Sequence, residues 1–328
     1  MTDTHPGILD RLARYLDKLH FDRAEKCVTV GDETIEYDSA KRLRQELGSA
    51  LYRHWHSGSV IRPEDRDLHR DFDFEDLLRE ATPHRTSKTP AVVKSALLDG
   101  PLGQHILFDV GHVRLRIPGS EGPSPLPEIG TRTTLELPAI RPGLSPGFFL
   151  VNGSAGGNSS AGPVLRVYLH IDESSMAPAV WRAALTYLES LKATYRAKIL
   201  AKASRYPRRD AMVVYLAEES WHTVDGLVEA VRHLPGLKPD YSLMTCPIAD
   251  GVAFGWEPRD QRVGWDRMSL GQHRTMVIAH AVAAHLFEDA DLHTAVADGF
   301  HEANIDPQRP YRNGDSPDWT PVVRGAAS

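Results

Sequence analysis

The chain has 328 residues, of which 41% are hydrophobic and 25% charged, and its formal net charge is −6 at pH 7. This composition is typical of a soluble globular protein, and the negative charge argues against a general nucleic-acid binder. Only two cysteines are present, Cys27 and Cys246, and neither a secretory signal nor a membrane-spanning run is seen, so we expect a cytoplasmic protein without a disulfide framework.

The first 117 residues predict a largely helical region with two short hairpins. Apolar residues recur at helical spacing in residues 8–19, 43–55 and 72–78. Ser39 can cap the second of these helices, and the hairpins are predicted around Gly31 and Gly111. We expect this region to bind a peptide or a partner protein.

Residues 118–162 predict a connection without regular structure. Prolines are concentrated in residues 118–127 and 138–146, and residues 152–162 are rich in Gly, Ser and Ala. Such composition is typical of extended and flexible segments.

The second half alternates more regularly between strand and helix patterns. Strands are predicted at residues 164–171, 195–200 and 211–216, and helices at 178–192, 224–234 and 270–287. This order favours an α+β fold with a mixed or mostly antiparallel sheet flanked by helices, formed by residues 163–303. Residues 304–328 predict a tail that is poorly ordered or wrapped over the surface.

Residues 192–209 carry seven cations and no acid in an acidic chain. These are Lys192, Arg196, Lys198, Lys202, Arg205, Arg208 and Arg209. Strand alternation places Arg196 and Lys198 on one face, and the last three arginines fall in the turn that follows. Arginine suits phosphate oxygens, and neighbouring cations favour the neutral form of a lysine, which can then act as a base. The alternative is a solvated face whose charges pair with acids elsewhere.

Two further patterns could form part of an anion site. Alternation places Arg166, Tyr168 and His170 on one strand face, where His170 could serve as a general acid. His273 and Arg274 follow Ser269 at the start of the last long helix, and helix N-termini favour anions. The alternatives are the solvent side of a half-buried sheet and ordinary helix capping.

The sequence contains no motif for a metal or a nucleotide cofactor. Its histidines lack HExxH spacing, its acidic residues 71–76 lack the glycine of a calcium loop, and GxxxxGK[ST], GxGxxG and GxSxG are absent. We therefore expect neither a metal nor a cofactor.

A series of short motifs gives the second half a family resemblance. In order, they are residues 145–149 (SPGFF), 166–168 (RVY), 195–200 (YRAKIL), 203–215 (ASRYPRRDAMVVY), 247 with 251–254 (P, GVAF) and 269–274 (SLGQHR). Over about residues 145–288 the chain thus resembles the HopA-type family of type III secretion effectors, and especially its stand-alone bacterial homologues.

The resemblance implies a lyase of peptide natural-product biosynthesis. In class V lanthipeptide and thioamitide clusters, a kinase-like partner phosphorylates Ser and Thr of a ribosomal precursor peptide. The HopA-like protein then eliminates phosphate to give dehydroalanine or dehydrobutyrine, without metal or cofactor. Related phosphothreonine lyases combine a lysine base, a histidine acid and cations that hold the phosphate.

Carried onto this sequence, the resemblance and the residue patterns give each candidate a role. Lys198 is the base, His170 the first choice of acid with His273 the second, and Tyr215 an orienting or packing residue. The candidates for holding phosphate are Arg166, Arg205, Arg208, Arg209 and Arg274. The alternatives are a non-catalytic HopA-like protein that binds a peptide or phosphopeptide, and a secreted effector.

Overall fold

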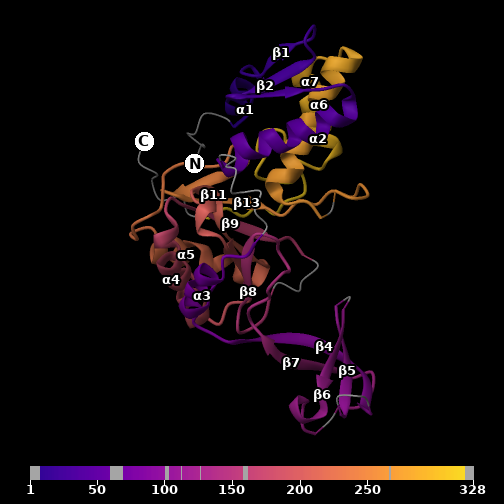
Figure 1. Cartoon of the computed structure of the whole chain (residues 1–328), viewed down its shortest axis with the longest axis vertical. Coiled ribbons are helices and arrows are strands. Elements are labelled where there is room, and N and C mark those ends of the chain that lie inside the picture. Colours follow the sequence, from indigo (N-terminus) through magenta and orange to yellow (C-terminus); the bar gives the residue numbers. More distant parts are fainter. Residues whose placement is uncertain are drawn as a thin grey trace.

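The computed structural model describes residues 8–59, 69–99, 103–111, 113–125, 127–157, 162–265 and 267–321. Over these residues the chain forms seven α-helices and three antiparallel sheets, which confirms the predicted α+β class. Figure 1 shows a helical part at the top, a central sheet with its own helices, and a small sheet that projects at the bottom. None of the described helices is long and apolar enough to cross a membrane.

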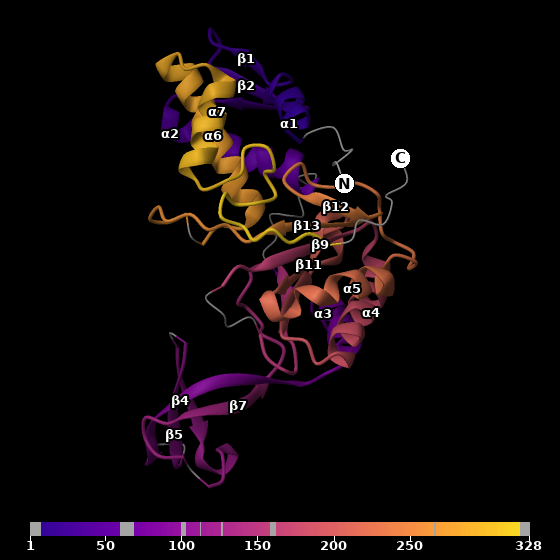
Figure 2. The same cartoon turned by 180° about the vertical axis from the view of Figure 1, so that it is seen from behind.

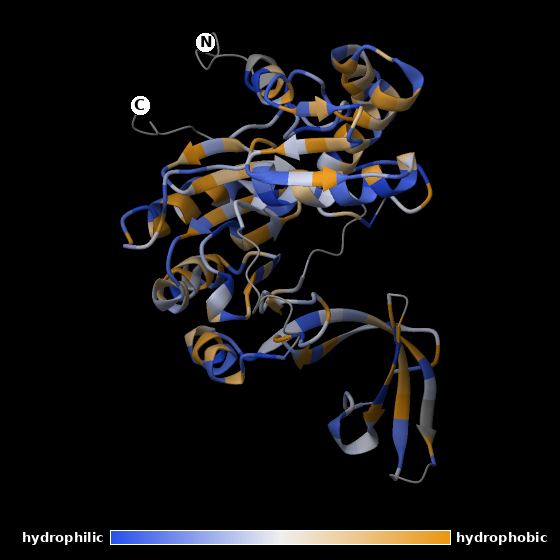
Figure 3. Cartoon of the chain, turned by 45° about the horizontal axis from the view of Figure 1, so that its top comes forward, coloured by the Kyte–Doolittle hydropathy of each residue, from blue (hydrophilic) through white to orange (hydrophobic). Residues whose placement is uncertain are grey.

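The central sheet has six antiparallel strands in the order β12-β13-β9-β11-β10-β8. These strands are β8 (Phe148–Asn152), β9 (Leu165–Ile171), β10 (Tyr195–Leu200), β11 (Arg208–Leu216), β12 (Cys246–Ala249) and β13 (Val252–Trp256). One face packs on α3 (Phe72–Ala81), α4 (Ala177–Ser190) and α5 (Val224–Val231) in the main hydrophobic core. Apolar and polar stretches alternate along the helices beside the sheet, as amphipathic helices require (Figure 3).

A second core joins the two ends of the chain. Its elements are α1 (Ile8–Leu16), β1 (His20–Asp22), β2 (Cys27–Val30), β3 (Glu33–Glu36), α2 (Ala40–Leu51), α6 (Leu270–Glu288) and α7 (Leu292–Glu302). The predicted apolar stripe of α2 is fully buried at Leu43, Leu47 and Leu51, and α2 packs directly on α6. Figures 1 and 2 show these indigo and yellow segments side by side. The N-terminal helices therefore belong structurally with the C-terminal ones.

The projecting sheet differs from the predicted connection. It contains β4 (Thr86–Leu98), β5 (His105–Val110), β6 (Val113–Pro118) and β7 (Arg132–Pro138) in the order β6-β5-β4-β7. The boundary predicted after residue 117 falls inside this sheet, because β7 pairs with β4 along its whole length. This strand was not predicted because prolines and polar residues surround it and only Leu135 of the strand is buried, which gives no clear alternation.

The C-terminal segment packs against the sheet over its described part. Tyr311, Arg312 and Asn313 are buried, and the Trp256 amide donates a hydrogen bond to the Tyr311 carbonyl at 2.7 Å. Of the two predictions for this tail, the structure therefore supports the wrapped one up to residue 321. In the predicted flexible stretch, residues 158–161 lie outside the described residues, and Gly153 is held by the Tyr195 carbonyl at 2.8 Å.

Candidate functional site

Two rows of side chains cross the face of the central sheet that lies away from α4 and α5. Lys198 of β10 lies opposite Val213 of β11, which lies opposite Tyr168 of β9. In the neighbouring row, Tyr215 lies between Arg196 and Arg166. Opposed residues in antiparallel strands share a face, so the predicted alternation of β9 and β10 is confirmed. Three separate sequence motifs thus meet on one surface.

This face forms the floor of a cleft of about 570 Å³. Tyr52 and His56 line it from the π-helical turn Tyr52–Ser57, which continues α2. Phe148 lines it from β8, and Gln272 from the start of α6. That start is fixed by a capping box. The Ser269 hydroxyl accepts a hydrogen bond from the backbone N–H of Gln272, and the Gln272 side-chain oxygen accepts one from the backbone N–H of Ser269.

Lys198 is the cation of the cleft whose ammonium group lies among aromatic rings. Its Nζ lies 4.1 Å from the centre of the Phe148 ring and 5.9 Å from that of Tyr215. Among the described residues no carboxylate oxygen lies within 4 Å of this nitrogen. Aromatic faces stabilise a cation weakly compared with a carboxylate, so the amine can interact with a ligand.

Arg166 is buried across β11 from Lys198 and held in a fixed orientation. Its Nε donates to Glu257, and its guanidinium lies 5.0 Å from the centre of the Tyr215 ring. Burial would lower the pKa of Arg166, but the Glu257 carboxylate, together with Tyr168 and Tyr215, raises that pKa well above its ordinary value. The guanidinium is therefore a permanent, positioned positive charge.

Arg208 borders the cleft through a buried network with Asp210 and Tyr52. The Arg208 guanidinium donates two hydrogen bonds of 2.8 Å to the two Asp210 oxygens, and the Tyr52 hydroxyl donates to Asp210 at 2.7 Å. Burial would raise the pKa of Asp210, yet Arg208 holds it far below its usual range. Burial and the Asp210 charge both raise the pKa of Tyr52, which therefore keeps its proton. Arg208 begins β11, contrary to the prediction that it lies in the preceding turn.

His56 lines the cleft although the sequence patterns did not single it out as a catalytic candidate. It is buried, its Nδ1 lies 2.7 Å from the Ser242 hydroxyl, and its Nε2 lies 4.0 Å from Asp210 Oδ2. Burial lowers the pKa of His56 to about 4, and nearby arginines act in the same direction. The available signal was the four-residue spacing of Tyr52 and His56 beside the apolar stripe of α2, which places both on one helical face.

His273 and Arg274 do not reach the cleft, which corrects their assignment as acid and phosphate ligand. His273 Nε2 lies 2.8 Å from Asp260, and its Nδ1 lies 2.6 Å from Arg274 Nη1. Arg274 also donates to the carbonyls of Pro310 and Arg312 and to the Asn313 side chain. Both side chains are completely buried, and the hydrogen bonds of Arg274 fix the C-terminal segment on α6.

His170, Arg209 and Arg205 lie outside the cleft as well. His170 is at the far end of β9, where its Nδ1 lies 3.0 Å from the Asp240 carbonyl. Arg209 pairs with the Asp240 carboxylate at 2.8 Å and donates to the His54 carbonyl. Arg205 lines a neighbouring cavity of about 630 Å³, which shares Ser145, Pro146 and Phe148 with the cleft. Strand alternation predicted the correct face for His170 but not its distance along the strand.

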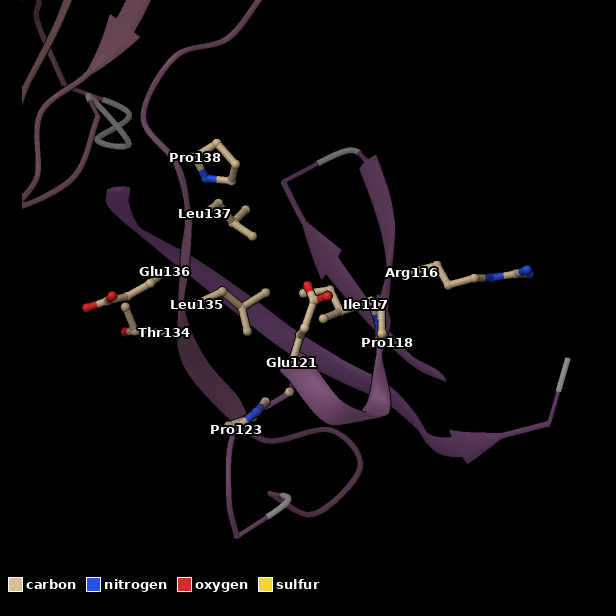
Figure 4. A pocket seen from close by; sticks show the side chains of 11 residues that line it. Arg116, Ile117, Pro118, Glu121, Pro123, Thr134, Leu135, Glu136, Leu137 and Pro138 are labelled. Atoms are coloured by element: carbon tan, nitrogen blue, oxygen red, sulfur yellow. The ribbon is translucent and has the colours of Figure 1, made fainter. Parts of the chain in front are cut away.

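A smaller cavity of about 340 Å³ lies on the projecting sheet (Figure 4). One side is formed by the end of β6 and the segment after it, and the other side by β7. Its wall consists of residues 116–118, 121–123 and 134–138, none of which lines the cleft. The described residues contain no group of three or more His, Cys, Asp or Glu side chains placed to hold a metal ion.

The fold and cleft define an α+β protein with a basic, aromatic-walled site on an antiparallel sheet. The model of the HopA1 effector protein family matches residues 139–312, and the chain belongs to that family. A search of curated proteins found no match.

Two solved structures of effector proteins are similar to the chain at low identity. That from Pseudomonas syringae pv. tomato strain DC3000 is 12% identical, with a TM-score of 0.46 over 84% of this chain and 95% of that one. That from Pseudomonas syringae pv. syringae strain 61 is 10% identical, with a TM-score of 0.45 over 84% of this chain and 97% of that one.

Proposed function

We propose that the protein is a phosphoserine/phosphothreonine lyase that eliminates phosphate from a phosphorylated peptide. The observation that carries this proposal is the meeting of Lys198, Arg166 and Tyr215, from three different strands, in one cleft. Among the residues that the structure describes, three arginines line that cleft beside Lys198 (Arg166, Arg196 and Arg267), against two carboxylates (Asp210 and Glu257). Such an excess of positive charge favours a dianionic ligand.

β-Elimination requires a base at Cα and compensation for the charge of the departing phosphate. In its neutral form, Lys198 takes the Cα proton, and the electrons of that C–H bond form the Cα=Cβ double bond. The Cβ–O bond breaks at the same time and its electrons leave with the phosphate. Arg166 uses Nε for Glu257, so its Nη groups are the ones placed to meet phosphate oxygens, and Arg208 adds charge at the edge of the cleft.

We assign the general acid to His56, in place of His170 and His273. Its Nδ1 contacts Ser242, which leaves Nε2 on the side of Asp210 and the cleft. A phosphate dianion beside the ring favours the protonated imidazole and opposes the effect of burial. The proton then passes to the oxygen of the leaving group.

The proposed substrate is a ribosomal precursor peptide phosphorylated by a separate kinase, as in lanthipeptide and thioamitide biosynthesis. Its products would be dehydroalanine from phosphoserine and dehydrobutyrine from phosphothreonine. The family membership and the positive cleft support this assignment.

The test is incubation of the purified full chain with a phosphoserine or phosphothreonine peptide, followed by mass spectrometry and a phosphate assay. We expect the peptide to lose the mass of one phosphoric acid, and Lys198→Ala to lower the rate by at least about 100-fold. Lys94→Ala, at a lysine of the projecting sheet that pairs with Asp109, is the matched control and should leave the rate unchanged. Tight binding without a change of mass would instead establish a non-catalytic phosphopeptide-binding protein.

A further inference from the structure

A second cavity of about 580 Å³ adjoins the cleft between α2 and α6. Tyr52, Arg267 and Gln272 line both spaces, so the two cavities adjoin at these side chains. We call it the methionine cavity because Met268 and Met276 form its wall together with Gly48. Its volume falls within the range of about 300–1,000 Å³ that is usual for ligand pockets.

Three polar side chains of this wall, Ser49, Thr275 and Arg53, form their hydrogen bonds within the protein. The Ser49 hydroxyl donates to the Gln45 carbonyl at 3.0 Å, and the Thr275 hydroxyl donates to the Gly271 carbonyl at 2.8 Å. The Arg53 guanidinium donates to Glu33 on the neighbouring hairpin. Apart from Arg267 and Gln272, which line both cavities, the surface left for a ligand is provided by thioethers, aliphatic groups and the ring of Tyr52.

Gly48 sets the shape of the cavity. A Cβ atom at this position would lie 2.3 Å from Met276 Sδ, so a larger residue would force the methionine to move. Met276 instead lies directly on the backbone of α2. Methionine is flexible and polarizable, and methionine-lined surfaces accommodate apolar groups of different shapes.

We propose that the methionine cavity binds an apolar side chain of the phosphopeptide, within about three residues of the phosphorylated one. This inference rests on the proposed function, because continuity with the cleft identifies the occupant as part of the same substrate. An extended chain advances about 3.3 Å per residue, so a neighbouring side chain reaches a space that shares three wall residues with the cleft. The polar cleft would hold the phosphate, and the methionine cavity would select the sequence around it.

The test uses a set of phosphothreonine peptides in which leucine or serine occupies each position from three before to three after the phosphorylated residue. Kd is measured by fluorescence anisotropy, and phosphate release is measured in parallel. We expect leucine at one of these positions to improve Kd by about 10- to 100-fold over serine. Met268→Glu and Met276→Glu should abolish this preference, so that the leucine and serine peptides bind each variant with the same Kd.

Met176→Glu is the matched control, because Met176 is also half-buried but lies just before α4, outside both cavities. Met268→Leu, which keeps the wall apolar, should retain the preference and guards against misfolding of the glutamate variants. Equal Kd values for all peptides, or a preference that survives both glutamate variants, would overturn the inference.

The outcomes separate this inference from the proposed function. A leucine preference without phosphate release would support peptide binding by the methionine cavity and refute the proposed lyase activity. Phosphate release without any preference for leucine would support the lyase activity and refute peptide binding by the methionine cavity. Failure of every peptide to bind would refute both.

Discussion

Acidification should destabilise the protein through two buried histidines. The pKa values of His56 and His273 are both lowered from 6.5 to about 4, in each case first by burial. The unfolded chain therefore binds more protons than the folded one between these two pH values, and stability must fall as the pH falls from 6.5 towards 4. Each histidine should lower the free energy of unfolding at pH 5 by about 2 kcal/mol relative to pH 8, and the two together by about 4 kcal/mol.

The buried carboxylates of the same networks do not contribute to the loss of stability between pH 8 and pH 5. Arginine partners hold the pKa of Asp210 far below its usual range, and that of Asp260 at about 2, although burial acts against them. Their stabilisation is complete above the unfolded pKa of about 3.8 and is lost only below it. The pKa values of His170 and His280 are also lowered by burial, so they add to the loss rather than offset it.

The measurement is urea denaturation at pH 8 and pH 5, with the free energy of unfolding compared between variants. His56→Asn should reduce the loss on acidification by about 2 kcal/mol, because the variant has no imidazole to protonate at this position. His20→Asn, at an exposed histidine, should leave the loss unchanged. A wild-type protein that is equally stable at both pH values, or a His56→Asn variant with the full loss, would refute the reasoning.

Three further substitutions test the networks around the cleft. In Gly271→Ala the new Cβ would lie 2.2 Å from the buried His56 ring, so we expect a loss of about 1–3 kcal/mol in urea denaturation and a lower kcat for phosphate release. Arg274→Met leaves two carbonyls of the C-terminal segment without their donor, and should cost about 3 kcal/mol and expose residues 310–313 to limited proteolysis, read by mass spectrometry. Arg208→Met leaves the Asp210 carboxylate buried without its cation, and should lower the free energy of unfolding by about 3–5 kcal/mol. A second substitution, Asp210→Leu, should restore most of this loss in a double-mutant cycle.

Periodicity predicted the elements that bury one continuous face. The stripe of α2 and the alternation of β9 and β10 are strong patterns, and both are confirmed. The β7 strand was not predicted because prolines and polar residues dominate its surroundings and one buried leucine is too weak a signal. The β8 strand was missed because it has only five residues and follows a proline-rich stretch.

The face of each site residue could be predicted from the sequence, but its position along the element could not. Arg166 and His170 share one face of β9, yet only Arg166 lines the cleft, because the turn after α2 and the start of α6 cover the middle of the sheet. Likewise, His273 and Arg274 stand at a helix start that favours anions, but this turn is buried under residues 310–313. Such placement depends on packing between distant segments, which local patterns do not contain.

The cleft is completed by residues that lie outside the matched family region. Lys198, Arg166 and Tyr215 fall within residues 139–312, whereas Tyr52 and His56 come from the N-terminal segment. This segment is held in place by the packing of α2 on α6, and Gly271 of α6 allows His56 to lie directly against it. If His56 is the acid, the base and the phosphate ligands belong to the family core, while the acid depends on how the two ends of the chain meet. The N-terminal helices would then be part of the catalytic unit, and not a separate module for binding a partner.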